Sequence, residues 1–538
     1  MAVTFKSRSS KLTLAITAQP TTTEYLQGDS LNLTGIQVMA TRRDGTPVDV
    51  TSSCTFSPSN GSTISSSGTI TVTANYHGKS AATTVTSYAI DRIAVTTPPT
   101  QTSFGYGDTI SYSGIVVKAY ANNDSIERDV TSQCTYNPAN GAILTEQAGT
   151  HDATITWRTK STTQSYRIIV KIYGAQWSGG SSSAWTRTDD ASSFSSPSPA
   201  VNNGNGSSPF DNILPWSGVE RVVEGGQNQV LVKIPKFYYK WTRSGSSMKL
   251  QISMSSFVGS HVSPAHADRG DGSGERDYVY VGAYPCANVP SASLFHYRSL
   301  SGRTPITNIT RATARSNIHS YVGENYWQWD YAMYWTICML YLVEYADWNV
   351  QAKIGFGNVT LQTTGQTDSM RYHTGTSATK RTNNGHVRYR YIEDLWTNCW
   401  SWIDGNYVTY SSKSQSYSTY IILNPSNFND SSGGTSVGTK AVSDTGAAYV
   451  TGWTSNPSSS NYMYAILPSS VDSSLDGTTY CCDSLYDELY TSGTGSLAVG
   501  GIDYSSFSSG NGLGLFDVSI LSVTTQSSEV GCRLMKLP

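Results

Sequence analysis

Residues Val322–Gly357 read VGENYWQWDYAMYWTICMLYLVEYADWNVQAKIGFG, a long and strongly apolar run that favours a helix. Residues at three- and four-residue steps define one helical face: Trp327, Tyr331, Tyr334, Trp335, Cys338, Leu342, Tyr345 and Ala346. The opposite face, from Met333 to Val343, is also largely apolar. A helix that is apolar nearly all round has to be enclosed by other elements, so we predict a large β-rich domain built around it.

This apolar run does not have the features of a membrane span. Glu344 and Asp347 interrupt it, and its apolar part is shorter than the roughly 20 residues that cross a bilayer. The N-terminal segment Met1–Pro20 has no apolar core and no small-residue cleavage site, as a secretory signal would require. We therefore expect neither membrane insertion nor export through a signal peptide.

The composition is that of a contact-forming β-protein. Charged residues make up 14% of the chain, and 35 Tyr and 13 Trp accompany only 12 Phe. Tyrosine and tryptophan supply a large contact area with a polar tip, as extracellular and adhesive surfaces do. The net charge of −2 excludes strong nucleic-acid binding by bulk electrostatics. An extracellular character without an export signal fits phage structural proteins, which leave the cell by lysis.

The sequence shows no catalytic or metal-binding constellation. None of the eight cysteines forms a CxxC pair, which argues against zinc ribbons and thioredoxin chemistry, and we predict free thiols. His261 and His266 have poor metal-ligand spacing, and the acidic pairs Glu393-Asp394 and Asp487-Glu488 are interpreted as solvated or helix-end charges. No Walker or GxSxG motif is present. We expect no catalytic residues, no metal and no cofactor.

Residues 9–173 contain an internal duplication. DVTSSCTFSPSNG begins at Asp49, and DVTSQCTYNPANG begins 80 residues later at Asp129. Each copy has short alternating apolar and polar runs, separated by turn signals such as Asp44-Gly45. This spacing predicts two β-sandwiches of about seven strands each.

The repeated motifs resemble a known family. Leu26-Gln27-Gly28-Asp29, Leu33-Thr34-Gly35-Ile36-Gln37-Val38 and Asp49-Val50-Thr51 are similar to bacterial immunoglobulin-like (Big) domains, and Tyr106-Gly107-Asp108 begins the same pattern in the second copy. Such domains occur on surface adhesins and phage virion proteins. The equivalent cysteines, Cys54 and Cys134, stand one per copy, which excludes a disulfide within a domain.

The remainder of the chain predicts a third, larger domain. Residues 174–230 are rich in Gly, Ser, Pro and Asn but carry recurrent aromatics, so we interpret them as an ordered, irregular lead-in. Val230–Trp241 reads as one strand with an internal proline, typical of an edge or bulged strand. Thr310 is expected to cap a helix over Arg311–Val322. The stretch Asp268–Gly274, which contains Arg-Gly-Asp, is interpreted as a surface loop.

A second resemblance covers most of residues 174–538. The segments IPKFYYK, YVGAY, EYADWNVQAKIGFG, IEDLWTNCWSWIDG and LAVGGIDYSSF…GLGLF…VGCRL are similar to phage and prophage proteins of the C-type lectin fold. That superfamily includes formylglycine-generating enzymes and the variable proteins of diversity-generating retroelements, such as the phage major tropism determinant. The Glu-Pro-Asn, Gln-Pro-Asp and Trp-Asn-Asp signatures of calcium-dependent sugar-binding lectins are absent.

The resemblance implies that the C-terminal segment returns to the core sheet and that the loops before it form the ligand face. The alternative is that Tyr504 and Phe507 merely cover the core. The candidate ligand-binding residues are Ile502, Asp503, Tyr504, Ser506, Phe507, Asn511 and Leu513.

The expected organisation is mainly β: a tail (1–8), two Ig-like β-sandwiches (9–88 and 89–173) and an α+β C-type-lectin-like domain with a buried central helix (174–538, led in by 174–230). We expect a phage virion protein of the tail or capsid surface, such as a tail fibre, tail tip or head fibre. It would bind a host-surface glycan or protein non-covalently, contact other virion proteins and form a homo-oligomer, with a trimer favoured. The alternatives are a purely structural connector or capsid decoration protein, and a polysaccharide-degrading enzyme.

Overall fold

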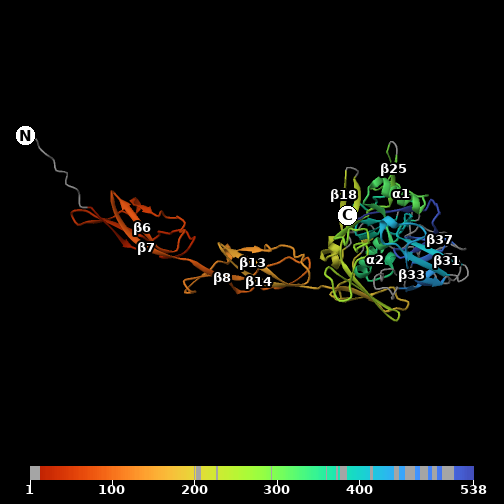
Figure 1. Cartoon of the computed structure of the whole chain (residues 1–538), viewed down its shortest axis with the longest axis horizontal. Coiled ribbons are helices and arrows are strands. Elements are labelled where there is room, and N and C mark those ends of the chain that lie inside the picture. Colours follow the sequence, from red (N-terminus) through yellow and green to blue (C-terminus); the bar gives the residue numbers. More distant parts are fainter. Residues whose placement is uncertain are drawn as a thin grey trace, which may run out of the picture. The chain divides into compact units, whose positions relative to one another are not determined.

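The computed structural model describes residues 12–538 except 199, 202–206, 226–227, 292–293, 359, 371–372, 376–384, 412–415, 442–447, 455–466, 473–482, 488–492 and 500–513. The chain divides into two compact units, Met1–Ile169 and Val170–Pro538. Strands outnumber helices throughout the described residues, so the protein is mainly β, as predicted (Figure 1).

The first repeat folds as the predicted seven-stranded sandwich. One sheet has the order β1-β3-β4 and the other β2-β7-β6-β5. The predicted turn at Asp44-Gly45 forms, with Gly45 at a φ of 82°. The strands are β1 (Thr13–Ala18), β2 (Glu24–Leu26), β3 (Gln37–Thr41), β4 (Pro47–Asp49), β5 (Thr55–Ser57), β6 (Gly68–Tyr76) and β7 (Lys79–Tyr88).

The second repeat has the same topology, with sheets β11-β10-β8 and β12-β13-β14-β9. Equivalent residues occupy equivalent places: Val38 of β3 and Val117 of β10 are both fully buried. The strands are β8 (Ile90–Thr97), β9 (Ser103–Gly105), β10 (Val116–Ala121), β11 (Ile126–Asp129), β12 (Thr135–Asn137), β13 (Gly149–Trp157) and β14 (Lys160–Ile169).

The second unit contains several sheets, one large hydrophobic cluster and two smaller ones. A five-stranded sheet, β16-β15-β21-β20-β22, comprises β15 (Tyr173–Trp177), β16 (Thr186–Asp189), β20 (Tyr238–Ser244), β21 (Ser247–Ser253) and β22 (His261–Val262). Another, β18-β19-β23-β40-β26, comprises β18 (Glu220–Glu224), β19 (Gln229–Pro235), β23 (Tyr278–Gly282), β26 (Tyr326–Gln328) and β40 (Leu534–Lys536). A four-stranded sheet comprises β17 (Ala200–Val201), β27 (His373–Gly375), β28 (Val387–Tyr389) and β29 (Ile392–Glu393).

A ten-stranded sheet dominates the C-terminal part of this unit. Its main path is β33-β32-β31-β37-β38-β36-β34-β35, and β30 joins β39 to it by pairing with β37. Its strands are β30 (Trp400–Trp402), β31 (Asn406–Ser411), β32 (Ser416–Ile421), β33 (Thr435–Ala441), β34 (Ala448–Thr454), β35 (Leu467–Asp472), β36 (Ser484–Asp487), β37 (Gly493–Val499), β38 (Val518–Ser522) and β39 (Val530–Cys532).

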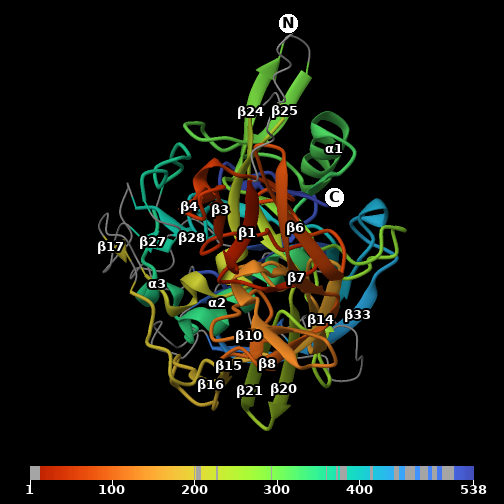
Figure 2. The ribbon, with the colours of Figure 1, turned by 90° about the vertical axis from the view of Figure 1, so that its left-hand side faces the viewer.

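Helix α1 (Arg311–Val322) forms as predicted. The Thr310 side chain accepts a hydrogen bond from the Thr313 amide, and Gly323 follows the last helical residue. The hairpin of β24 (Cys286–Ser291) and β25 (Leu294–Ser299) lies beside this helix (Figure 2). Capping by a threonine hydroxyl satisfies an amide that the first helical turn leaves free.

The predicted apolar helix is present but is shorter than the apolar run Val322–Gly357 from which it was predicted. Helix α2 (Tyr331–Tyr345) has all of its residues buried. Asp330 is its N-cap rather than a residue of its first turn, and its carboxylate accepts a hydrogen bond from the Met333 amide. Trp327 belongs to β26, where it pairs with Met535 of β40, because the chain there completes a sheet before it enters the helix. A four-residue helix, α3 (Val350–Lys353), follows.

The prediction of a single strand over Val230–Trp241, at a sheet edge or with a bulge, is wrong. The segment forms two strands in different sheets, β19 and β20. Pro235 is the last residue of β19, where the loss of its amide matters least, and the chain then leaves that sheet. β19 lies between β18 and β23 and is therefore not an edge.

The described residues of the lead-in carry short strands, and several of its aromatic side chains are buried. Trp177, Trp185, Phe210 and Trp216 are all buried within the main hydrophobic cluster of the second unit. Six cysteines are free among the residues that the structure describes: Cys54, Cys134, Cys286, Cys338, Cys399 and Cys532.

The Arg-Gly-Asp stretch is only partly a surface loop. Gly270 is exposed, but the Arg269 side chain is buried and forms an ion pair with Asp330. Arg269 therefore serves the N-terminus of α2 and does not present a tripeptide to solvent. Among the described residues, no helix is long and apolar enough to cross a membrane.

Truncating one buried side chain of α2 tests whether the stability of the second unit depends on this helix. Leu342 is fully buried, so Leu342→Ala leaves a cavity that should cost about 2–5 kcal/mol of unfolding free energy. We expect the urea transition of the second unit to shift, while the transition of the first unit stays in place. Val258→Ala, at a side chain that is 90% exposed, is the control and should shift neither transition. An unchanged transition for Leu342→Ala would contradict the role assigned to α2.

Candidate functional site

All seven predicted ligand-binding residues fall in one connection. Ile502, Asp503, Tyr504, Ser506, Phe507, Asn511 and Leu513 follow β37 and precede β38, within residues 500–513 that lie outside the described part of the chain. The assignment of these residues to a ligand face therefore stays a prediction. The structure does define the frame from which this connection departs and to which it returns.

The departure point lies in the middle of the ten-stranded sheet. Val499, the last residue of β37, pairs with Val518 of β38 on one side and with Ser401 of β30 on the other. Val499 is 1% exposed and Val518 is 5% exposed. β30 also pairs in parallel with β39, so four strands converge where the connection begins. Val499, the residue that precedes the connection, is thus held by backbone pairing on both sides.

Gly514, where the chain returns from the connection, is held just as closely; we call it the return point. A Cβ on Gly514 would lie 2.3 Å from a carboxylate oxygen of Asp483 and 2.6 Å from a methyl carbon of Val350, so only glycine fits there. The Phe516 amide donates to Asp483 over 2.8 Å, and the Tyr334 hydroxyl of α2 donates to the Leu515 carbonyl over 2.7 Å. Residues of α2, α3 and the residue before β36 therefore fix the returning backbone.

An aromatic cluster supports this return. Trp348 and Trp453 stack with ring centroids 5.1 Å apart, and Phe516 meets Trp348 edge-on at 5.0 Å. Such pairs contribute beyond their buried area. The cluster therefore adds packing around Phe516, two residues after the return point.

A second group of chemically capable side chains lies on the four-stranded sheet. His386 precedes β28, Glu393 ends β29 and Asp394 follows it, and their ligating atoms lie within 4.8 Å of one another. The exposed fractions of these side chains are 4%, 0% and 4%. The chain reverses between the strands through Arg390 and Tyr391, which have positive φ values of 45° and 68°. This reversal brings the three residues together.

Hydrogen bonds already engage both oxygens of each carboxylate. Glu393 accepts from the Gly365 amide at 2.7 Å and from the Thr367 amide and hydroxyl at 2.8 and 2.6 Å. Asp394 lies 3.1 Å from Nδ1 of His386 and accepts from the Asn398 amide group at 2.9 Å. A metal ion would have to compete with these donors for the carboxylate lone pairs. The geometry therefore favours a hydrogen-bonded cluster over a coordination shell.

The cluster holds protons more tightly than isolated side chains would. Burial raises the pKa of Glu393 to about 7, and the adjacent Asp394 carboxylate adds to the effect. Burial alone would lower the pKa of His386, but the Asp394 and Glu393 carboxylates outweigh it and raise this pKa above its ordinary value. Both shifts follow from placing two acids and one base in a dry site.

The interpretation of Glu393-Asp394 as a solvated pair is wrong, because both side chains are buried. The sequence signal that could have revealed the cluster is weak: a histidine seven residues before an acidic pair, with no periodic pattern between them. His266, by contrast, is a buried structural residue whose Nε2 lies 2.9 Å from the Ile234 carbonyl oxygen.

Comparison with known proteins identifies part of the first unit. Residues 18–87 match the family model of the bacterial Ig-like domain (group 3), which agrees with the resemblance noted from the sequence. This match covers the first repeat. No curated protein matches the chain.

Solved structures give weaker similarities. The S-layer protein rSbsC is 12% identical with a TM-score of 0.17, and the match covers 56% of this chain and 42% of that one. Domains 1–6 of surface layer protein SbsC are 15% identical with a TM-score of 0.17, covering 48% and 40%. A three-Ig-domain structure of titin is 9% identical with a TM-score of 0.14, covering 46% and 95%. The chain thus spans less than half the length of the S-layer structures, and TM-scores this low establish no shared fold.

Replacing Gly514 tests the anchoring of the return point. Gly514→Ala forces a methyl group against Asp483 and Val350 and should destabilise the second unit by about 1–3 kcal/mol through overpacking. Urea unfolding of the full chain measures the effect. Ser256→Ala, at an exposed residue of the same unit, should leave the midpoint unchanged. If both variants behave alike, the return point is not held as described.

The buried acid–histidine cluster predicts a pH dependence. Folded Glu393, with a pKa of about 7, keeps a proton that its unfolded form, near 4.5, releases. Folded His386 likewise keeps its proton at a pH where the unfolded side chain loses it. Through these two groups the unfolded state binds fewer protons. Buried His266, whose pKa is lowered to about 4, acts in the opposite sense below about pH 6.5, because only its unfolded form is protonated there. The unfolding free energy of the second unit should therefore fall as the pH rises from about 6.5 to about 8.

Glu393→Gln should flatten this decline, because one of the two shifted groups is gone. The measurement is the urea midpoint of the second unit at several pH values, read as a slope so that any constant cost of the substitution cancels. Glu275→Gln, which changes a partly exposed carboxylate, is the control and should retain the native slope. A slope that is identical in Glu393→Gln and the native chain would contradict the shift assigned to Glu393.

Proposed function

We propose that this chain is a phage virion adhesion protein of the tail or capsid surface, whose C-terminal unit binds a host-surface receptor non-covalently. The observation that carries the proposal is the frame around residues 500–513. Buried Val499 and the closely packed Gly514 hold the two ends, while the connection between them is composed mainly of Ser, Gly, Tyr and Asn. These residue types supply aromatic contact area and adaptable hydrogen bonding.

The C-type-lectin-like reading of residues 174–538 belongs to this proposal. That resemblance implies a closing segment inserted into the core, and the burial of Arg533 supports it. Its guanidinium donates to the carbonyl oxygens of Gly282 and Glu393 at 2.7 and 2.6 Å. β40 lies between β23 and β26 rather than at an edge, which supports the same reading.

The proposal assigns no catalysis to the chain. A polysaccharide-degrading enzyme needs a pair of carboxylates that the substrate can reach. Glu393 and Asp394 are instead buried and hydrogen-bonded within the protein, which supports a binding role over hydrolysis. The Ig-like repeats would act as the part that spaces the binding unit or joins it to other virion proteins. Assembly as a trimer would raise avidity by roughly 10²–10⁴ over a single weak contact.

The proposed receptor contact can be tested within the connection. The double variant Tyr504→Ala/Phe507→Ala should reduce binding of the purified chain to the phage's host cells at least tenfold, with an unchanged urea midpoint. Val258→Ala is the control for an exposed apolar side chain outside the proposed face. Binding measured by flow cytometry of labelled protein distinguishes these outcomes.

Three other results would overturn the assignment. Unchanged binding in the double variant would move the receptor contact elsewhere. Virions that lack residues 174–538 and fail to assemble would favour the structural connector, since an adhesin mutant should fail only in adsorption. Release of sugar fragments from host polysaccharide by the intact chain would revive the enzyme alternative.

A further inference from the structure

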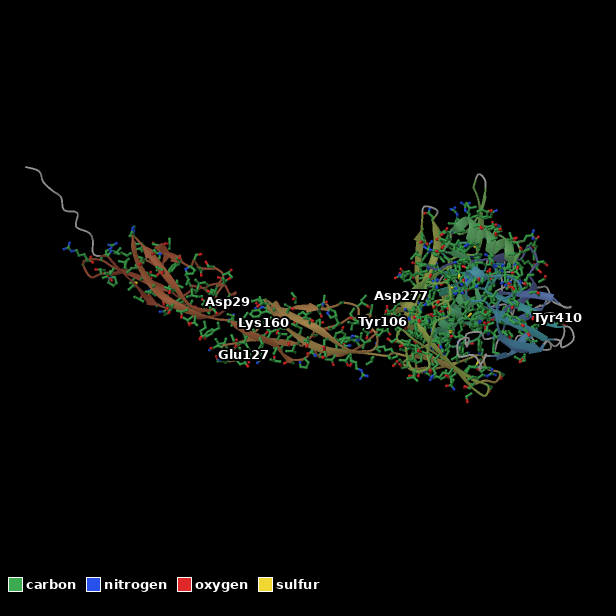
Figure 3. The ribbon with its side chains drawn as sticks, in the orientation of Figure 1. Asp29, Tyr106, Glu127, Lys160, Asp277 and Tyr410 are labelled. Carbon is green, nitrogen blue, oxygen red and sulfur yellow. The ribbon has the colours of Figure 1, made fainter. Side chains whose placement is uncertain are left out.

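The junction between the two Ig-like repeats is built around one aspartate. Asp29 of the first repeat forms ion pairs with Arg128 over 2.6 Å and with Arg158 over 2.8 Å, both from the second repeat. Arg158 also donates to the Gln27 carbonyl over 2.5 Å. Figure 3 labels Asp29 beside Glu127 and Lys160, which lie on the β10–β11 and β13–β14 hairpins that receive it.

The aspartate turn brings an apolar residue with it. Leu26 is fully buried and belongs to the hydrophobic cluster of the second repeat, although it comes from the first. The Asp29 carboxylate also accepts from the Leu26 amide at 2.7 Å, which keeps the turn closed. Partial burial would raise the pKa of Asp29, but the two arginines outweigh it and hold the pKa below its ordinary value. The second repeat thus recognises a leucine and an aspartate on one tight turn.

The first repeat has the same end, in the same conformation. The β6–β7 hairpin of the first repeat corresponds to the β13–β14 hairpin of the second, with Tyr76 paired to Lys79 where Trp157 pairs with Lys160. His77 stands where the second repeat has Arg158, and both have a positive φ, 42° and 52°. The duplicated sequence has therefore preserved the geometry of this hairpin.

This end of the first repeat, which we name the N-terminal hollow, is a depression with a cationic rim and an apolar wall. Arg42, Arg43 and Lys79 are exposed, and no ion pair involves them among the residues that the structure describes. Val48, which replaces Arg128 of the second repeat, is 37% exposed and lines the wall together with Leu12. Asp44 is the one acid of the lining and caps its own turn by accepting from the Thr46 amide.

We propose that the N-terminal hollow receives a tight turn of another protein, one that presents an acidic side chain with a leucine-like residue a few positions before it. Charge complementarity and the internal template both favour this occupant. A free polyanion would satisfy the cations but leave the apolar wall uncovered. Residues 1–11 of the same chain contain Lys6, Arg8 and Lys11 and no acid, so their charge opposes the rim. This inference concerns the end opposite the proposed receptor site in sequence and does not rest on it.

The direct test uses a cyclic peptide of residues 24–31, EYLQGDSL, which is the turn that fills the equivalent end of the second repeat. Titration of the full chain, followed by NMR at His77, should show saturable binding. Asp29→Asn in the peptide should weaken binding at least tenfold, as should Arg43→Glu/Lys79→Glu in the chain. Arg167→Glu, at an exposed arginine of the second repeat, is the control for a charge reversal away from the hollow and should leave binding unchanged.

A fused chain tests the same contact when the free peptide binds weakly. An additional copy of residues 12–89 placed ahead of residue 12 brings its own Asp29 turn to the N-terminal hollow at a high effective concentration. Hydrogen exchange of the Gly78 and Lys79 amides should slow at least tenfold, and Asp29→Asn in the added copy should abolish this protection. Equal exchange in the fused and native chains would overturn the proposal.

Other outcomes would assign the hollow to a different occupant and so refute the proposal. Binding of a sulfated polysaccharide that is lost in Arg43→Glu/Lys79→Glu, with no binding of the peptide, would make the hollow a polyanion site. Self-association of the native chain that depends on Arg43 and Lys79 would make the occupant a second copy. Stronger peptide binding after removal of residues 1–11 would show that the chain's own terminus occupies the hollow.

Discussion

The complete burial of α2 is the constraint on which the second unit depends. A helix without a solvent face must find partners inside the protein for its charged groups, because an unpaired buried charge costs several kcal/mol. Glu344 lies in the last turn, where the helix dipole disfavours a carboxylate. Arg390 pairs with it, and the Tyr389 hydroxyl donates to it over 3.0 Å. The β28–β29 turn is thus held to the helix by electrostatics as well as by packing.

The other end of α2 imposes the same requirement on a different segment. Asp330 caps the helix, and its second oxygen is neutralised by Arg269. That pairing draws the loop after β22 inward, although its glycines and acids are typical of an exposed loop. One buried helix therefore organises two distant segments through its two terminal carboxylates. Packing of sheets against the apolar sides of α2 would not by itself have given Asp330 and Glu344 their charged partners.

Local signals in the sequence predicted the features that depend on neighbouring residues. The duplicated turns of the first unit, the Thr310 cap and the apolar run of α2 all act within a few residues of one another, and each is present. The break after Pro235 was missed because two strands in different sheets can read as one run when only a short link separates them. The inward direction of Arg269 was missed because its partner is 61 residues away.

The same limit applies to the site residues. The cluster of His386, Glu393 and Asp394 depends on a reversal through positive-φ residues that no glycine marks, and its hydrogen bonds come from a loop near Thr367. The junction of the repeats joins Asp29 to Arg158, 129 residues apart. In the sequence, Gly28-Asp29 marks only the repeat. Contacts of this kind become visible only when the fold brings the partners together.

The anchoring of residues 500–513 bears on how a binding surface could change without loss of the fold. Val499 is held by pairing on both sides, and Gly514 is held by Asp483 and Val350, so both ends depend on residues outside the connection. If the connection makes the proposed receptor contact, substitutions between the two anchors would change that surface and leave Val499 and Gly514 unchanged. A protein that meets changing receptors benefits from this separation, because recognition and stability are then carried by different residues.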